Sequence, residues 1–110
     1  MNRHPLALFL LALCLAGTVA RPAAAQDYVL SLKDNKFQPA EIEIPADRKV
    51  ALTVKNLDPT VAEFESTDLN REKVVTAGGQ ITIYVGPLQA GRYEFFNDFH
   101  PEARGHIVVK

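Results

Sequence analysis

The 110-residue sequence contains very little sulfur: one cysteine, Cys14, and one methionine, Met1, both among the first 25 residues. A single cysteine cannot form a disulfide within one chain, so a disulfide-stapled scaffold is excluded, as is a Cys-x-x-Cys redox motif. The sequence also has no glycine-rich phosphate-binding loop and no Ser-His-Asp arrangement for nucleophilic catalysis. Metal coordination and protein interaction remain as classes of function.

Concentrated charge of one sign is absent as well. The chain has 12 Lys and Arg against 13 Asp and Glu, for a formal net charge of −1. The basic residues are scattered, whereas nucleic-acid binding calls for a basic patch. No polybasic segment or basic amphipathic helix indicates a membrane surface. The sequence therefore predicts no nucleic-acid partner.

The only long apolar run covers residues 6–20, and Arg3 precedes it. This run is shorter than the roughly 20 residues that span a bilayer, and Ala23-Ala24-Ala25 supplies the small residues of a signal-peptidase site. Acylation at Cys14 is disfavoured because the bulky Leu13 precedes it. We therefore expect a signal peptide at 1–25, a periplasmic domain at 26–110, and a mature charge of −3 after loss of Arg3 and Arg21.

Apolar and polar residues alternate along the rest of the chain with the period of a β-strand. Val50, Leu52 and Val54 fall on one face of a strand predicted at 49–55. Turn residues separate such runs at short intervals, which is typical of an all-β sandwich or barrel. Helix is expected only at 66–73, and there for at most one or two turns. The other predicted strands cover residues 28–33, 41–44, 80–85, 92–96 and 106–110.

The C-terminal segment carries a recognisable pattern. Gly91-x-Tyr93-x-Phe95 precedes a loop with His100, and Gly105 and an apolar strand follow. This pattern resembles the closing hairpin of the cupredoxins. The resemblance covers residues 28–110, because Phe37-x-Pro39, Ile42-x-Ile44-x-Ala46 and Val50-x-Leu52-x-Val54-x-Asn56 match the opening strands. It implies a cupredoxin-like Greek-key β-sandwich.

The ligand positions of the family are largely replaced in this sequence. His100 falls at the loop histidine, Asn97 at the cysteine and Glu63 nearest the first histidine; the methionine position falls near Ala103. A blue-copper centre needs a thiolate and two imidazoles, so we expect none here.

The residues that replace those ligands are rich in oxygen. Glu63 and Glu65 are two apart on a predicted strand, so both side chains point to one face about 6.5 Å apart. Two such glutamates are often only a solvated face, and a lone loop histidine is often only a surface residue. Because the two segments meet at one pole of a cupredoxin, however, the resemblance implies a metal site there. Its predicted ligands are Glu63, Glu65, Asp98 and His100, with Asn97 or Glu102 as possible extra ligands.

A narrower resemblance rests on Glu63-Phe64-Glu65, Leu69-Asn70-Arg71-Glu72-Lys73, Tyr84-Val85-Gly86-Pro87-Leu88 and Phe95-Phe96-x-x-Phe99-His100. These motifs are similar to the EfeO-type cupredoxin-like domains, which occur as FtrB-like periplasmic components of bacterial ferrous-iron uptake. The resemblance implies an iron or copper ion, ferroxidase-like oxidation of Fe(II), and a periplasmic iron-binding partner or membrane iron permease. Carboxylates with one imidazole suit Fe(II), Fe(III), Mn(II) or Cu(II) better than Cu(I). Two alternatives stay open: a metal-free interaction module and a periplasmic copper-binding protein.

Cleavage after Ala25 is directly testable, because the predicted site follows an apolar run that is too short to span a bilayer. We expect the exported protein to begin at or near Gln26, which intact-mass spectrometry of the purified form measures. A species that keeps residues 1–25, or that is acylated at Cys14, would contradict this prediction.

Overall fold

The computed structural model describes residues 28–110, which form nine β-strands. Within this range no helix is long and apolar enough to cross a membrane. The strands are β1 (Tyr28–Lys33), β2 (Lys36–Gln38), β3 (Glu41–Ile44), β4 (Val50–Asn56), β5 (Ala62–Ser66), β6 (Arg71–Val75), β7 (Gln80–Val85), β8 (Gly91–Asn97) and β9 (His100–Val109).

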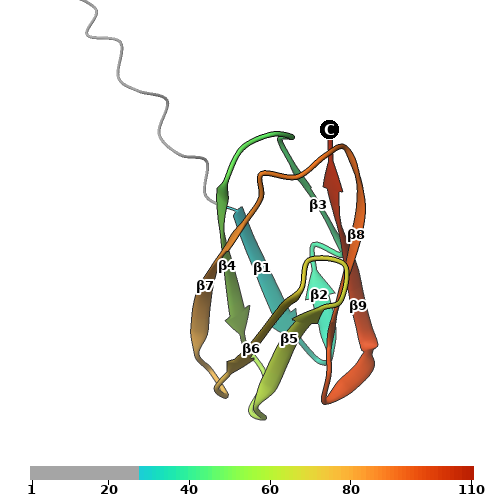
Figure 1. The fold of residues 1–110 in the computed structure, drawn as a ribbon. Coiled ribbons are helices and arrows are strands. Elements are labelled where there is room, and N and C mark those ends of the chain that lie inside the picture. The colour runs from blue at the N-terminus through green and yellow to red at the C-terminus, as the bar shows by residue number, and fades with distance from the viewer. Residues whose placement is uncertain (1–27) are drawn as a thin grey trace, which may run out of the picture.

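The strands form two sheets packed face to face (Figure 1). The first sheet has the order β2-β1-β4-β7, and the second has the order β3-β9-β8-β5-β6. Pairing is antiparallel except between β1 and β4 and between β3 and β9. The chain runs directly from edge strand β2 of the first sheet to edge strand β3 of the second, and β7 and β6 are the opposite edge strands of the two sheets. The predicted all-β sandwich is confirmed.

The core follows from the alternation seen in the sequence. Along β4 every second residue is buried, which places Val50, Leu52 and Val54 between the sheets. An aromatic group joins the two layers: the Phe95 ring stacks on Phe64 at 5.4 Å and meets Phe37 edge-on at 4.9 Å. Phe95 is fully buried, so these contacts add to the area term of hydrophobic burial. Phe64 is thereby fixed inward, which decides where its two neighbours point.

Local structure differs from the sequence-based expectation in two places. Residues 66–73, where helical turns were considered, instead end β5, turn, and begin β6; Asn70 takes a positive φ of 52° in that turn. The β-branched pair Val74-Val75 favours this strand, and pairing with β5 completes it. The predicted loop after Asn97 is short, since β9 already begins at His100.

One buried polar side chain, that of Asn56, organises the end of the sandwich where the chain passes from β4 to β5. The Asn56 amide donates to the carbonyl oxygens of Thr60, Val75 and Thr76, at 2.8, 3.2 and 3.2 Å. Its Oδ1 accepts from the Asp58 backbone N–H at 3.1 Å. Asn56 therefore satisfies the backbone groups of the loop that leads into β5 and of the end of β6, because buried polar groups need partners.

Gly105 on β9 is expected to tolerate no side chain. A Cβ there would lie 2.6 Å from the Ala40 carbonyl oxygen and would also clash with the Phe95 ring. Gly105→Ala should therefore lower the free energy of unfolding by about 1–3 kcal/mol, the usual cost of overpacking. Urea denaturation measures the loss. Gly91→Ala is the matched control, since a Cβ at Gly91 meets only the Tyr93 ring at 3.6 Å or beyond; equal destabilisation of both variants would contradict the prediction.

Candidate metal site

β5 places two glutamates side by side on the outer face of the second sheet. Ala62, Phe64 and Ser66 point into the core, so Glu63 and Glu65 must point outward. Glu63 is nevertheless only 8 % exposed, and Glu65 is half-buried. Strand period and core packing alone thus give a buried carboxylate and a half-buried one on a single face, as predicted.

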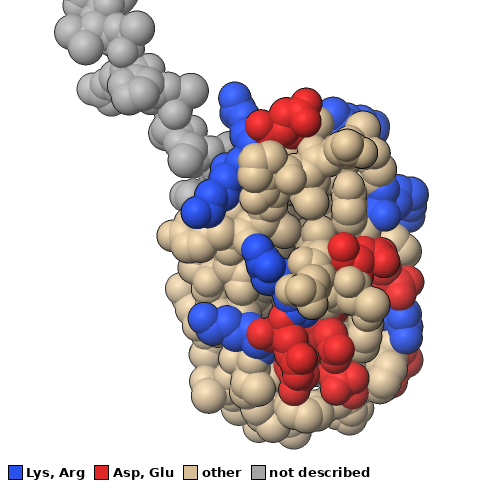
Figure 2. All heavy atoms as spheres, viewed as in Figure 1, with Lys and Arg blue, Asp and Glu red and all other residues tan. Residues whose placement is uncertain are grey.

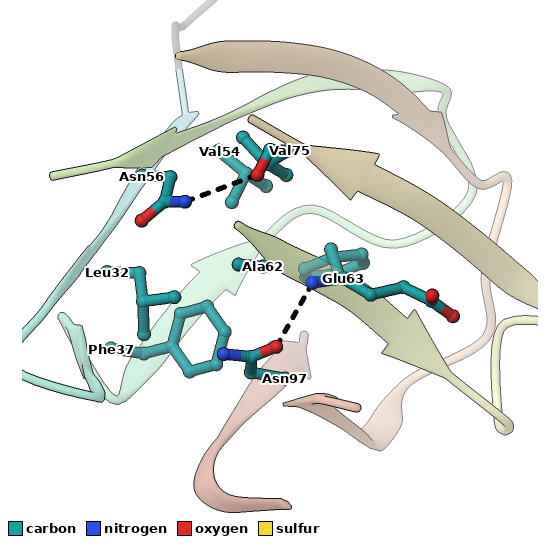
Figure 3. A pocket seen from close by; sticks show the side chains of 9 residues that line it. Leu32, Phe37, Val54, Asn56, Ala62, Glu63, Val75 and Asn97 are labelled. Atoms are coloured by element: carbon teal, nitrogen blue, oxygen red, sulfur yellow. Dashed lines mark hydrogen bonds between the residues drawn. The ribbon is translucent and has the colours of Figure 1, made fainter. Parts of the chain in front are cut away.

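Asn97 ties the end of β8 to β5 (Figure 3). It is 1 % exposed, and its Oδ1 accepts the backbone N–H of Glu63 at 3.0 Å and that of Phe99 at 3.2 Å. The Asp98 N–H donates to the Glu63 carbonyl oxygen at 2.9 Å. These bonds hold Asp98 beside the β5 glutamates. The gap lined by Asn97 and the core residues has no room for water, and the Glu63 side chain extends away from it.

Three of the four predicted ligands converge. Ligand oxygens of Glu63, Glu65 and Asp98 all lie within 4.8 Å of one another. Figure 2 shows one group of acidic side chains over β5 and β6, apart from other acidic side chains on this face and with basic side chains beside it. We call Glu63, Glu65 and Asp98 the acidic cluster.

Glu72 on β6 is a fourth carboxylate that the sequence analysis did not assign to the site. It lies directly opposite Glu65 in the β5–β6 pairing and diagonally from Glu63, so it shares their face. The helical interpretation of residues 66–73 concealed this relation. The signal that could have revealed it is the pair Val74-Val75 after a polar turn, which favours a hairpin over a helix.

Crowding of like charges perturbs the acids. A hydrogen bond shared with Glu72, followed by burial and by the charges of Glu72, Asp98 and Glu65, raises the pKa of Glu63 to about 7. Burial, followed by the charges of Asp98 and Glu72, raises the pKa of Glu65. The bond between Glu63 and Glu72 needs a proton on one of the two. With both ionised, the buried Glu63 Oε1 has no hydrogen-bond donor among residues 28–110.

His100, the fourth predicted ligand, is not in this group. Its Nδ1 lies 3.7 Å from Glu102 Oε1, and both side chains are well exposed, at 43 % and 68 %. His106 lies 3.7 Å from Glu94 Oε2 on the same sheet. Asn97, considered as an extra ligand, uses its oxygen for two backbone N–H groups. The structure thus gathers carboxylates and leaves the imidazole outside.

The donor chemistry decides which ions fit. Carboxylate oxygens suit hard cations, and a cation would supply the partner that Glu63 Oε1 lacks. A blue-copper centre does not fit, because it needs a thiolate and residues 28–110 include no cysteine. The amide of Asn97 stands where the resemblance places that thiolate, and it is committed to the backbone.

The raised pKa of Glu63 makes metal-free stability pH-dependent. Between pH 4.5 and about 7 the folded protein keeps a proton on Glu63 that the unfolded chain has released. Stability should therefore be highest below pH 4.5 and fall as pH rises through about 7. Urea denaturation across this range, with a chelator present, measures the slope. Glu63→Gln should flatten it, whereas Glu43→Gln, at an exposed glutamate paired with Lys110, should not; an unchanged slope in Glu63→Gln would refute the assignment.

Comparison with known proteins gives relatives of two kinds. An uncharacterized protein of Rickettsia prowazekii (strain Madrid E) is 46 % identical over 81 residues, which are 73 % of this chain. The match spans 65 % of the length of that relative.

Solved structures share the fold at low identity. A purple cupredoxin from Nitrosopumilus maritimus is 21 % identical with a TM-score of 0.62, covering 76 % of this chain and 100 % of that one. Amicyanin from Paracoccus versutus is 20 % identical with a TM-score of 0.61, covering 83 % and 86 %. The metal-binding domain of the Cu(I)-exporting P-type ATPase of Streptococcus pneumoniae D39, solved with Cu(I), is 16 % identical with a TM-score of 0.72, covering 83 % and 91 %.

The family described as the cupredoxin-like domain matches residues 6–109, nearly the whole sequence. The two-sheet β-sandwich of residues 28–110 agrees with this family match. The chain therefore belongs to the cupredoxin-like domain family.

Proposed function

We propose that this protein binds a transition-metal ion, iron or Cu(II), through the acidic cluster. The observation that carries the proposal is the Glu63 side chain: it belongs to a residue that is only 8 % exposed, it is crowded by other acids, and its buried Oε1 lacks a donor. Leaving a buried polar atom unpaired is costly, and a cation at the cluster removes that cost together with the repulsion. Glu65 and Asp98 would complete the ligand set, with Glu72 close enough to join it.

The role in the cell is proposed from the resemblance to EfeO-type domains. This resemblance supports a role as a periplasmic component of ferrous-iron uptake. In that role the protein would exchange its ion with an iron-binding partner or an iron permease. Oxidation of Fe(II) stays a prediction from the same resemblance. Copper is named for one of the structures of similar fold, the Streptococcus pneumoniae ATPase domain, which was solved with Cu(I). Cu(II) therefore belongs among the ions to be tested.

Loss of the buried carboxylate should weaken metal binding more than loss of the histidine. We expect Glu63→Gln to reduce Mn(II) or Cu(II) affinity about tenfold or more, since even outer partners of metal ligands matter that much. His100→Ala should have a smaller effect because His100 is not in the cluster. Calorimetric titration at neutral pH measures each affinity, and His106→Ala is the control.

Two results would contradict the proposal. If His100→Ala abolishes binding while Glu63→Gln does not, the ion lies on the imidazole and not in the cluster. If neither Mn(II), Fe(II) nor Cu(II) binds the unmodified protein, the metal-free interaction module is the better description.

A further inference from the structure

Two hollows lie near the acidic cluster, and one of them is lined by Glu65, a member of the cluster. One, of about 180 Å³, is lined by Glu65 and Glu72 together with Thr67, Asn70 and Arg71, and with Ser66 at its edge. The other, of about 300 Å³, lies between β6 and β7. Arg71 and Glu72 line both hollows, so the hollows meet at these two residues and adjoin the cluster.

The second hollow has a mixed lining of apolar residues, polar residues, two cations and one acid, Glu72. Phe64 and Ile83 contribute apolar surface, and Arg71, Lys73 and Tyr84 contribute polar groups. Arg71 and Lys73 precede and follow Glu72 on β6, so strand alternation turns them away from the acids and toward β7. Two cations thus lie on the opposite face of β6 from Glu72, across this edge strand from the acidic cluster.

Neither Arg71 nor Lys73 is neutralised by an ion pair within residues 28–110, although the acids are close in sequence. Arg71 donates through Nε and Nη2 to the Tyr84 carbonyl oxygen, each at 3.3 Å, and through Nη1 to the Asn70 carbonyl oxygen at 3.4 Å. A guanidinium has five N–H groups, so two remain for a ligand while the backbone contacts hold it in place.

The paired arrangement of anionic and cationic surfaces fits a metal ion that arrives with an anion. Carboxylates of a chelator would be repelled by the acidic cluster but attracted by Arg71 and Lys73. Arginine binds carboxylates in a bidentate manner, and lysine adds a point charge. A bare aquo ion would gain nothing from the two cations, which would weaken its attraction to the cluster.

We propose that Arg71 and Lys73 bind the carboxylates of a small polycarboxylate chelator, so that the protein takes its metal ion as a chelate. This inference rests on the proposed metal-binding function of the acidic cluster. Thr67 and Asn70 offer further polar groups to the same ligand at the β5–β6 turn. The substrate class is thus a hard metal ion held by a small hydroxycarboxylate or polycarboxylate.

The test uses citrate as the chelator, with and without Fe(III), and the double variant Arg71→Gln/Lys73→Gln. Equilibrium dialysis with radiolabelled citrate should show that the unmodified protein retains citrate, alone and with Fe(III). The double variant should bind citrate about tenfold more weakly or worse, as expected for the loss of charged hydrogen bonds. Its affinity for Mn(II) alone should not fall, because no ligand of the cluster is changed.

The matched control is Arg48→Gln/Lys36→Gln, which removes the same charge from exposed positions elsewhere. Lys36 lies on β2, at the opposite edge of its sheet from β7. Unmodified protein that retains no citrate would overturn the inference, and so would a control variant that loses as much citrate as the double variant. Lys73→Gln alone serves as a second variant that keeps the Arg71 contacts to Tyr84 and Asn70.

The two proposals fail separately. Mn(II) binding without citrate binding leaves the metal site standing and removes the chelate. Citrate binding without Mn(II) binding removes the proposed metal function and, with it, the chelate as the substrate.

Discussion

The side-chain oxygen of Asn97 is the point on which the candidate site depends. It accepts two backbone N–H groups, one from β5 and one from the turn between β8 and β9. The β8–β9 pairing shifts register at this residue, so the ladder alone would not fix the turn. The Asn97 amide therefore has a structural role, because it holds Asp98 against the strand that carries Glu63 and Glu65.

The carboxylates held in this way oppose folding when they are all ionised. Burial and mutual repulsion raise the pKa of Glu63 and Glu65. At neutral pH the ionised carboxylates are therefore locally unfavourable, although the rest of the sandwich is well packed. The conflict is confined to one face of β5 and its neighbours, while the Phe37, Phe64 and Phe95 group packs behind it. Such local conflicts within consistent folds are typical of functional sites.

The fold could be predicted from sequence because the strand period and turn residues are local signals. The same alternation predicted that Glu63 and Glu65 point to one face of the strand. The resemblance predicted that Asp98 lies near them. Glu72 was not among the predicted ligands because its place depends on the register between β5 and β6, which no local pattern states. The separation of His100 from the cluster depends on the short β8–β9 turn, since β9 already begins at that residue.

Arg71 has a second consequence, for self-association. β6 and β7 are two of the four edge strands of the sandwich, and unpaired edges invite strands from other molecules. The Arg71 guanidinium covers the Tyr84 carbonyl oxygen, joining one edge to the other through a side chain. An incoming strand at β7 would have to displace that cation before it could form its own ladder. The same arginine therefore occupies one acceptor at which edge-to-edge pairing with β7 would form a hydrogen bond.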